Sequence, residues 1–119
     1  MGITVVRVKV KNPQYPKQEI EEEFLVDSGA TYSVVPGQML EKLGVKPHRR
    51  LTFTLADGTK VEREMGDALF EVEGILGAAP VVFGKKGDSL LLGAFTLEAL
   101  GLMLDPFKRK LRPMKLFLV

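Results

Sequence analysis

One acidic residue stands directly after an apolar run, and it constrains the rest of the chain more than any other feature. Asp27 follows Phe24–Val26 and is followed at once by Ser28, Gly29 and Ala30. A carboxylate taken out of water is costly unless it is paired or protonated. Glycine adopts positive φ freely, so Gly29 lets the backbone turn beside the acid. The stretch predicts an acid held rigidly at a strand end or, since these are also turn residues, a simple strand-ending turn.

Composition limits the class of protein. The chain has 119 residues, of which 45% are hydrophobic and 27% charged, so we expect residues 1–119 to form a single globular domain. With no cysteine, a disulfide framework and a thiolate metal site are excluded, and a reducing, cytoplasmic location is expected. The net charge of +2 argues against a nucleic-acid partner. No apolar stretch is long enough to span a membrane, and Arg7 and Lys9 lie inside a strand-like run, so no signal peptide is expected.

The hydrophobic pattern is mostly that of β-strands. Residues 6–10 and 19–26 alternate, which predicts a hairpin that leads to Asp27, with Glu21–Glu23 opposite the basic face of the first strand. Asp57-Gly58 between two alternating runs is a strong hairpin signal. Further strands are expected at 32–35, 51–55, 60–65, 68–72, 80–83, 90–92 and 102–105. Short helices are expected at 36–43 and 94–100, a basic turn at 106–113, and a final apolar run at 114–119.

Three of these features occur in an informative order. The Phe24–Ala30 motif comes early, the Asp57-Gly58 hairpin follows, and Leu90–Gly93 precedes a helix and the run Leu102–Asp105. In order and spacing the chain resembles the retropepsin-like (retroviral-type) aspartic proteases, as a prokaryotic single-domain member. The resemblance implies an all-β closed barrel with one or two short helices and an active site at a homodimer interface.

The resemblance also implies roles for individual residues. Asp27 would be the catalytic aspartate, supported by its neighbours Ser28, Gly29 and Ala30. The Ser28 hydroxyl would lock the active-site loops of two subunits together. Leu92 and Gly93 would pack against the loop that carries Asp27.

Substrate binding is implied for Thr31 and for a flap tip that closes over the peptide. The flap tip would consist of Ala56, Asp57, Gly58 and Thr59. The chain departs from many viral members at two points. Thr31 stands where those members have a second acid that grips the substrate backbone, and the flap tip here is poorer in glycine.

The chemistry itself requires a second acid. Peptide hydrolysis by carboxyl groups needs a base for water and an acid for the carbonyl oxygen, and two adjacent carboxyls that share one proton supply both. Asp27 has the only suitable setting, because Asp57 and Asp88 are expected in turns or loops and Asp105 at a strand end. A second copy of the chain would therefore complete the pair, unless a different protein supplies the second acid. The segments 1–5 and 116–119 pair either between subunits or within one chain.

These observations predict a homodimeric aspartic endopeptidase that acts on an extended peptide without a metal or organic cofactor. The alternative is a non-catalytic homodimeric module of the same fold that binds peptides or serves as a scaffold. His48, the single histidine, is expected to be an exposed loop residue. The sequence offers no cluster of metal ligands, no serine-hydrolase elbow and no glycine-rich phosphate loop.

Overall fold

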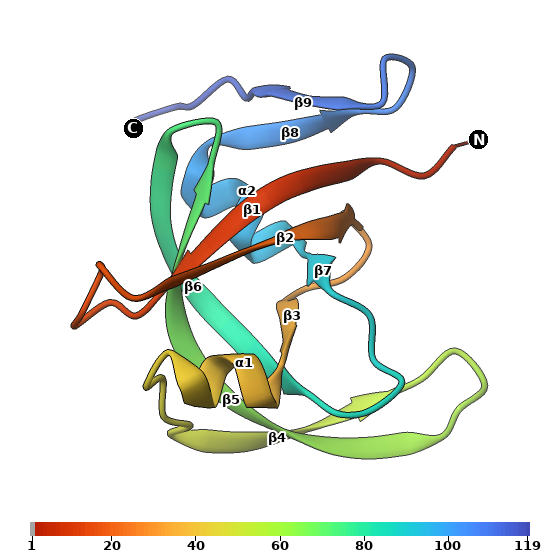
Figure 1. Ribbon diagram of the computed structural model, residues 1–119. Coiled ribbons are helices and arrows are strands. Elements are labelled where there is room, and N and C mark those ends of the chain that lie inside the picture. Colours follow the sequence, from red (N-terminus) through yellow and green to blue (C-terminus); the bar gives the residue numbers. More distant parts are fainter. Residues whose placement is uncertain (1) are drawn as a thin grey trace.

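Strands make up about half of the chain in the computed structural model, which describes residues 2–119 (Figure 1). The expected all-β class with two short helices is confirmed. In chain order the elements are β1 (Val5–Lys11), β2 (Glu19–Val26), β3 (Ser33–Pro36), α1 (Gly37–Lys42), β4 (Arg49–Thr54), β5 (Lys60–Val72), β6 (Ile75–Gly84), β7 (Leu91–Leu92), α2 (Ala94–Leu100), β8 (Leu102–Asp105) and β9 (Lys110–Pro113).

The main sheet closes into a ring. Its strand order is β1-β2-β7-β3-β6-β5-β4, and β1 also pairs with β5. Closure depends on the length of β5, whose 13 residues pair in turn with β4, β6 and β1. The β8–β9 hairpin forms a separate sheet at the end of the molecule away from β4 (Figure 1).

The β1–β2 hairpin forms as the alternating pattern predicts. Val8 and Val10 of β1 and Phe24 of β2 have no exposed surface and contribute to the core inside the ring. The charged residues between them face outward, where Arg7 Nε lies 3.0 Å from a carboxylate oxygen of Glu21. The predicted pairing of opposite charges across this hairpin is therefore confirmed for Glu21.

Two predicted strands, at 60–65 and 68–72, are in fact the single strand β5. The prediction of a break was wrong because Gly66 and Asp67 continue the ladder, opposite Val81 and Pro80 of β6. A Cβ atom on Gly66 would lie 2.9 Å from the Phe83 ring. The glycine is required here by close packing and does not mark the end of a strand.

β6 begins at Ile75, five residues before the predicted start at Pro80. A proline removes a ladder donor and is tolerated where a strand has a free edge. β3 pairs with β6 only from Val81 onward, so Pro80 lies where β5 is the single neighbour.

The predicted basic turn at 106–113 was wrong in its second half. The turn follows Asp105, whose carboxylate accepts the N–H groups of Phe107 and Lys108 at 3.1 Å each. Lys110–Pro113 then returns as β9 against β8. Leu111 alternates with charged neighbours and is buried against the core, which explains the strand.

The two ends of the chain differ in their pairing. Val5 lies opposite Leu25, and the Thr4 carbonyl accepts the N–H of Val26, so this part of the N-terminal segment pairs within the chain. Met1 lies outside the described residues. Residues 114–119 contain no strand, and Leu116–Val119 are largely exposed. Within residues 2–119 no helix is long and apolar enough to cross a membrane.

Candidate active site

Asp27 directly follows β2, and its backbone and side chain are both fixed. Its N–H donates to the Leu92 carbonyl over 3.0 Å, which extends the parallel pairing of β2 with β7. One carboxylate oxygen accepts the N–H of Gly29 at 2.9 Å, and the Asp27 carbonyl accepts the N–H of Ala30 at 3.1 Å. The residue is half-buried. The residue is thus both a strand end and the first residue of a turn, and the turn sets the direction of the carboxylate.

The loop after Asp27 is attached to the start of α2. The N–H groups of Ala94 and Phe95 donate to the carbonyls of Ala30 and Thr31 over 2.8 and 3.0 Å. These bonds satisfy helix donors that have no partner inside the helix. A Cβ atom on Gly93 would lie 2.6 Å from the carbonyl group of the Tyr32 backbone. Leu92 and Gly93 therefore lie directly against the loop, and only glycine permits this approach.

Two buried hydroxyls that the sequence analysis did not single out hold this region together. The side chains of Ser33 in β3 and Thr96 in α2 are fully buried and hydrogen-bond to each other. The Ser33 oxygen also accepts the N–H of Gly93 at 3.0 Å. The signal in the sequence is weak, because it consists of one small polar residue in each of two apolar stretches.

Ser28 and Gly29 lie on the surface. Within residues 2–119 the Ser28 hydroxyl has no hydrogen-bond partner. It borders a shallow groove whose other walls come from α2, β8 and the segment after β9, including Leu97, Met103 and Met114. The face that carries Asp27 is thus continuous with an apolar groove.

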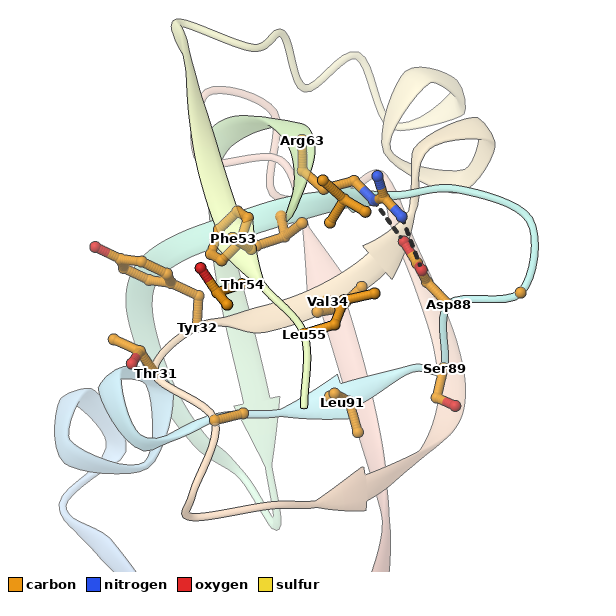
Figure 2. A pocket seen from close by; sticks show the side chains of 14 residues that line it. Thr31, Tyr32, Val34, Phe53, Thr54, Leu55, Arg63, Asp88, Ser89 and Leu91 are labelled. Carbon is orange, nitrogen blue, oxygen red and sulfur yellow. Dashed lines mark hydrogen bonds and ion pairs between the residues drawn. The ribbon is translucent and has the colours of Figure 1, made fainter. Parts of the chain in front are cut away.

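A pocket of about 440 Å³ lies between the loop after Asp27 and the β4–β5 hairpin (Figure 2). Its walls are mostly apolar. The lining residues are Ala30, Thr31, Tyr32, Val34, Phe53, Thr54, Leu55, Val61, Arg63, Val82, Gly87, Asp88, Ser89 and Leu91. Ala30 and Thr31 connect this pocket to the loop that begins at Asp27, although Asp27 itself does not line it.

The tip of the β4–β5 hairpin is a tight turn whose residues Ala56–Thr59 do not line the pocket. The Leu55 N–H donates to the Thr59 carbonyl over 2.7 Å, and Gly58 has a φ of +88°. The Thr59 N–H donates to the Asp57 carboxylate and thereby lowers the pKa of Asp57. The predicted hairpin is confirmed. Of the residues expected to contact substrate, Thr31 lines the pocket, whereas the exposed tip Ala56–Thr59 does not.

An ion pair forms the charged end of the pocket (Figure 2). Arg63 in β5 approaches Asp88 through two nitrogens, Nε at 2.8 Å and one terminal nitrogen at 3.2 Å. The Lys85 N–H donates to the same carboxylate at 2.8 Å. The hydrogen bond with Arg63 is the main cause of the lowered pKa of Asp88, and the same bond raises the pKa of Arg63. Asp88 is in a loop, as expected, whereas its pairing with Arg63 was not predicted.

Three aromatic rings connect the hairpin, the loop and α2. The Tyr32 ring stacks on Phe95, with centroids 5.6 Å apart and an interplanar angle of 14°. It also meets Phe53 of β4 edge to face at 6.3 Å. Tyr32 and Phe53 line the pocket, and Phe95 supports Tyr32 from α2.

The remaining candidate residues lie elsewhere. His48 is exposed, as expected, and lies 3.2 Å from Asp67, away from the pocket. Among residues 2–119 no group of three or more metal-ligating side chains comes together.

Comparisons with known proteins place the chain in a family. The profile of a family described as "gag-polyprotein putative aspartyl protease" matches residues 18–99. The protease of simian foamy virus (mac) has a similar structure, with a TM-score of 0.56, 21% identity, and coverage of 79% of this chain and 91% of that one. A retropepsin-like aspartic protease from Rickettsia conorii covers 89% of this chain and 95% of its own, with 22% identity and a TM-score of 0.43. No curated protein sequence matches. Because the profile spans most of the chain, from β2 through the β4–β5 hairpin into α2, the protein belongs to the retropepsin-like aspartyl protease family.

Proposed function

We propose that the protein is an aspartic endopeptidase whose catalytic pair consists of Asp27 from each of two copies of the chain. The observation that carries this proposal is the setting of Asp27. The residue is half-buried, and the Gly29 N–H fixes the direction of its carboxylate at the end of a strand. A carboxylate fixed at the surface is suited to meet a second one across a two-fold axis.

Two such carboxyls share one proton, because like charges so close together do not both ionise. The ionised Asp27 takes a proton from water, and the water oxygen attacks the carbonyl carbon of the scissile bond. The protonated Asp27 gives its proton to the carbonyl oxygen. The tetrahedral intermediate, a geminal diol, then collapses: the C–N bond breaks, the leaving nitrogen takes the proton from one carboxyl, and one hydroxyl of the diol gives its proton to the other carboxylate, which restores the shared proton of the pair.

The second copy is supported by the surface around Asp27. The Ser28 hydroxyl is exposed beside the acid, at the edge of the groove lined by Leu97 and Met103. A two-fold interface uses the same patch on both subunits. We place Ser28 and this groove at that interface, where the Ser28 hydroxyl gains a partner from the other chain.

The substrate is an extended peptide. It lies between the loop at Ala30 and Thr31 and the β4–β5 hairpin, where its backbone is bound as an added strand and one side chain enters the pocket. The tip Ala56–Thr59 closes over the peptide after binding, since it stands free of the pocket in the single chain.

The test is cleavage of an unfolded protein between about pH 4 and 7, a range that includes acidic conditions because the mechanism needs one proton on the pair. We expect Asp27→Asn to reduce kcat/KM by about a thousandfold or more. Asp67→Asn is the matched control, because Asp67 is exposed and away from the pocket, and it should cleave like the wild type. Equal cleavage by the wild type and Asp27→Asn would exclude Asp27 as the catalytic acid.

One observation favours a second candidate, the non-catalytic peptide-binding module. The pocket is complete within a single chain, and Asp27 does not line it. Such a module would retain peptides with the same affinity in the wild type and in Asp27→Asn, and neither protein would cleave them.

A further inference from the structure

The Arg63–Asp88 pair has an unusual position for an ion pair. Its side chains are 16% and 28% exposed, and both line the pocket. The guanidinium meets the carboxylate through two nitrogens, a geometry that fixes both groups. Its other terminal nitrogen donates to the Glu62 carbonyl at 2.9 Å. The pair also connects β5 to the loop between β6 and β7 (Figure 2). It therefore fixes the positions of the two segments that form this end of the pocket.

The charges of the pair cancel within an otherwise uncharged pocket. Among the described residues that line the pocket, Arg63 and Asp88 are the two that carry charge, and most of the others are apolar. A charged side chain that entered the pocket would lose water and would meet one attractive and one repulsive group. An apolar side chain loses nothing by entering.

We propose that Arg63 and Asp88 determine the specificity of this pocket: as a neutral pair they restrict it to uncharged, apolar side chains of a peptide, and the loss of either partner makes it select the opposite charge. The inference rests on the proposed binding of a peptide in this pocket. It does not depend on cleavage.

The two single variants leave opposite charges behind. In Asp88→Asn the guanidinium of Arg63 loses its counter-charge while it remains mostly shielded from water, so an acidic side chain of the peptide becomes its best partner. The asparagine retains an oxygen that can accept the Lys85 N–H, so the loop keeps its shape. Arg63→Gln leaves the Asp88 carboxylate and favours a lysine side chain. The double variant leaves no charge and should prefer apolar side chains, as the wild type does.

The first test measures binding. Three capped tripeptides Ala-Xaa-Ala, with Leu, Glu or Lys at the centre, are titrated into each variant in the Asp27→Asn background. The backbone amide NMR signals of Ser89 and Leu91 report occupation of the pocket. The parent should bind the Leu peptide best. Asp88→Asn should raise the affinity for Glu relative to Leu by about ten- to a hundredfold, as a hydrogen bond to a charged group allows. Arg63→Gln should do the same for Lys.

Arg7→Gln is the control, because it removes an exposed ion pair with Glu21 away from the pocket and should leave all three affinities unchanged. Circular dichroism checks folding. If one single variant unfolds, the other still tests the inference, because the two predicted preferences are opposite. Unchanged preferences in the folded variants, or signal shifts only outside the pocket, would overturn the inference.

The second test separates this inference from the proposed function. The same substitutions, with Asp27 intact, are compared on a peptide library with cut sites read by mass spectrometry. A shift to acidic residues beside the cut in Asp88→Asn supports both proposals. Cleavage with an unchanged preference refutes the specificity inference alone. The expected change in tripeptide binding without cleavage by any variant refutes the protease proposal alone.

Discussion

Gly93 has no side chain, and this allows the loop after Asp27 to pack directly against the start of α2. A Cβ atom there would lie 2.6 Å from the backbone of Tyr32, so either the loop or β7 must move. We expect Gly93→Ala to lower the free energy of unfolding by about 1–3 kcal/mol, the usual cost of overpacking. Urea denaturation measures the change.

The matched control for this prediction is Gly37→Ala at the start of α1. Its φ is not positive, and the nearest atom to an added Cβ is 3.4 Å away. Alanine there should be neutral or stabilise the protein by up to about 1 kcal/mol. Equal destabilisation by both substitutions would show that the close approach at Gly93 has no special importance.

The pKa of Asp88 predicts how acid affects stability. The hydrogen bond from Arg63 lowers this pKa below its ordinary value of 3.8, so folding favours the ionised carboxylate. Such a group contributes stability above the unfolded pKa and loses that contribution as the pH falls through the folded pKa. The wild type should therefore be more stable than Asp88→Asn at neutral pH, by a margin that is constant above about pH 5 and shrinks below 3.8. Urea melts of both proteins between pH 7 and 2 measure the margin, and a margin that persisted to the lowest pH would contradict this assignment.

The acid motif and its surroundings differ in how well single residues could be predicted. The place of Asp27 at a strand end and the start of a turn could be predicted because the signal is local, an acid between an apolar run and turn residues. The partners Arg63 and Asp88 are separated by 25 residues, and nothing in either local sequence indicates the other. The contact between Tyr32 and Phe53 is also formed only when the main sheet closes into a ring, and neither local sequence indicates it. Pairs that tertiary structure brings together are not visible in a local pattern.

At the scale of elements, we expect the contacts among the three aromatic rings Tyr32, Phe53 and Phe95 to couple the position of α2 to the shape of the pocket. Phe95 does not line the pocket, but it supports Tyr32, which does. We expect Phe95→Ala to raise KM for a cleaved peptide several-fold with a smaller change in kcat, since an aromatic pair contributes about 0.5–1.5 kcal/mol. Tyr32→Phe retains the stacked ring and should behave like the wild type.

Phe107→Ala is the control for this effect, because Phe107 is 95% exposed in the β8–β9 turn and does not line the pocket. Its substitution should leave both kinetic constants unchanged. If Phe95→Ala altered only the thermal stability and left KM unchanged, the rings would be a packing feature without influence on substrate binding.

The accuracy of the predicted elements follows from how local their signals are. β2, α2 and β8 were predicted with the observed bounds, because each has a clear period and a clear stop, such as Gly101 with its φ of +70° at the end of α2. The break at Gly66 was wrong because a glycine required by a neighbouring ring resembles a glycine that ends a strand. The strand at Lys110–Pro113 was not predicted because its run of basic residues is typical of an exposed turn, and Leu111 is the single buried residue that shows the alternation.

At the scale of the whole molecule, the proposed pairing of Asp27 residues from two copies of the chain predicts that activity depends on protein concentration. Dilution below the dimer dissociation constant should reduce the specific activity, and sedimentation should show monomer over the same range. Leu116–Val119 are apolar and exposed, so we expect them to pair with a second copy if the proposed dimer forms. The Met114 N–H, by contrast, donates to the Gly101 carbonyl within the same chain over 2.9 Å.

Deletion of Lys115–Val119 therefore separates folding from assembly. The deletion leaves β9 and the Met114 bond intact, so circular dichroism should be unchanged. The shortened chain should sediment as a monomer at concentrations where the full chain is a dimer, and its cleavage activity should fall in proportion to the lost dimer. A shortened chain that remained dimeric and active would place the interface on the Ser28 groove alone. A monomer with full activity would exclude a catalytic pair built from two copies of Asp27.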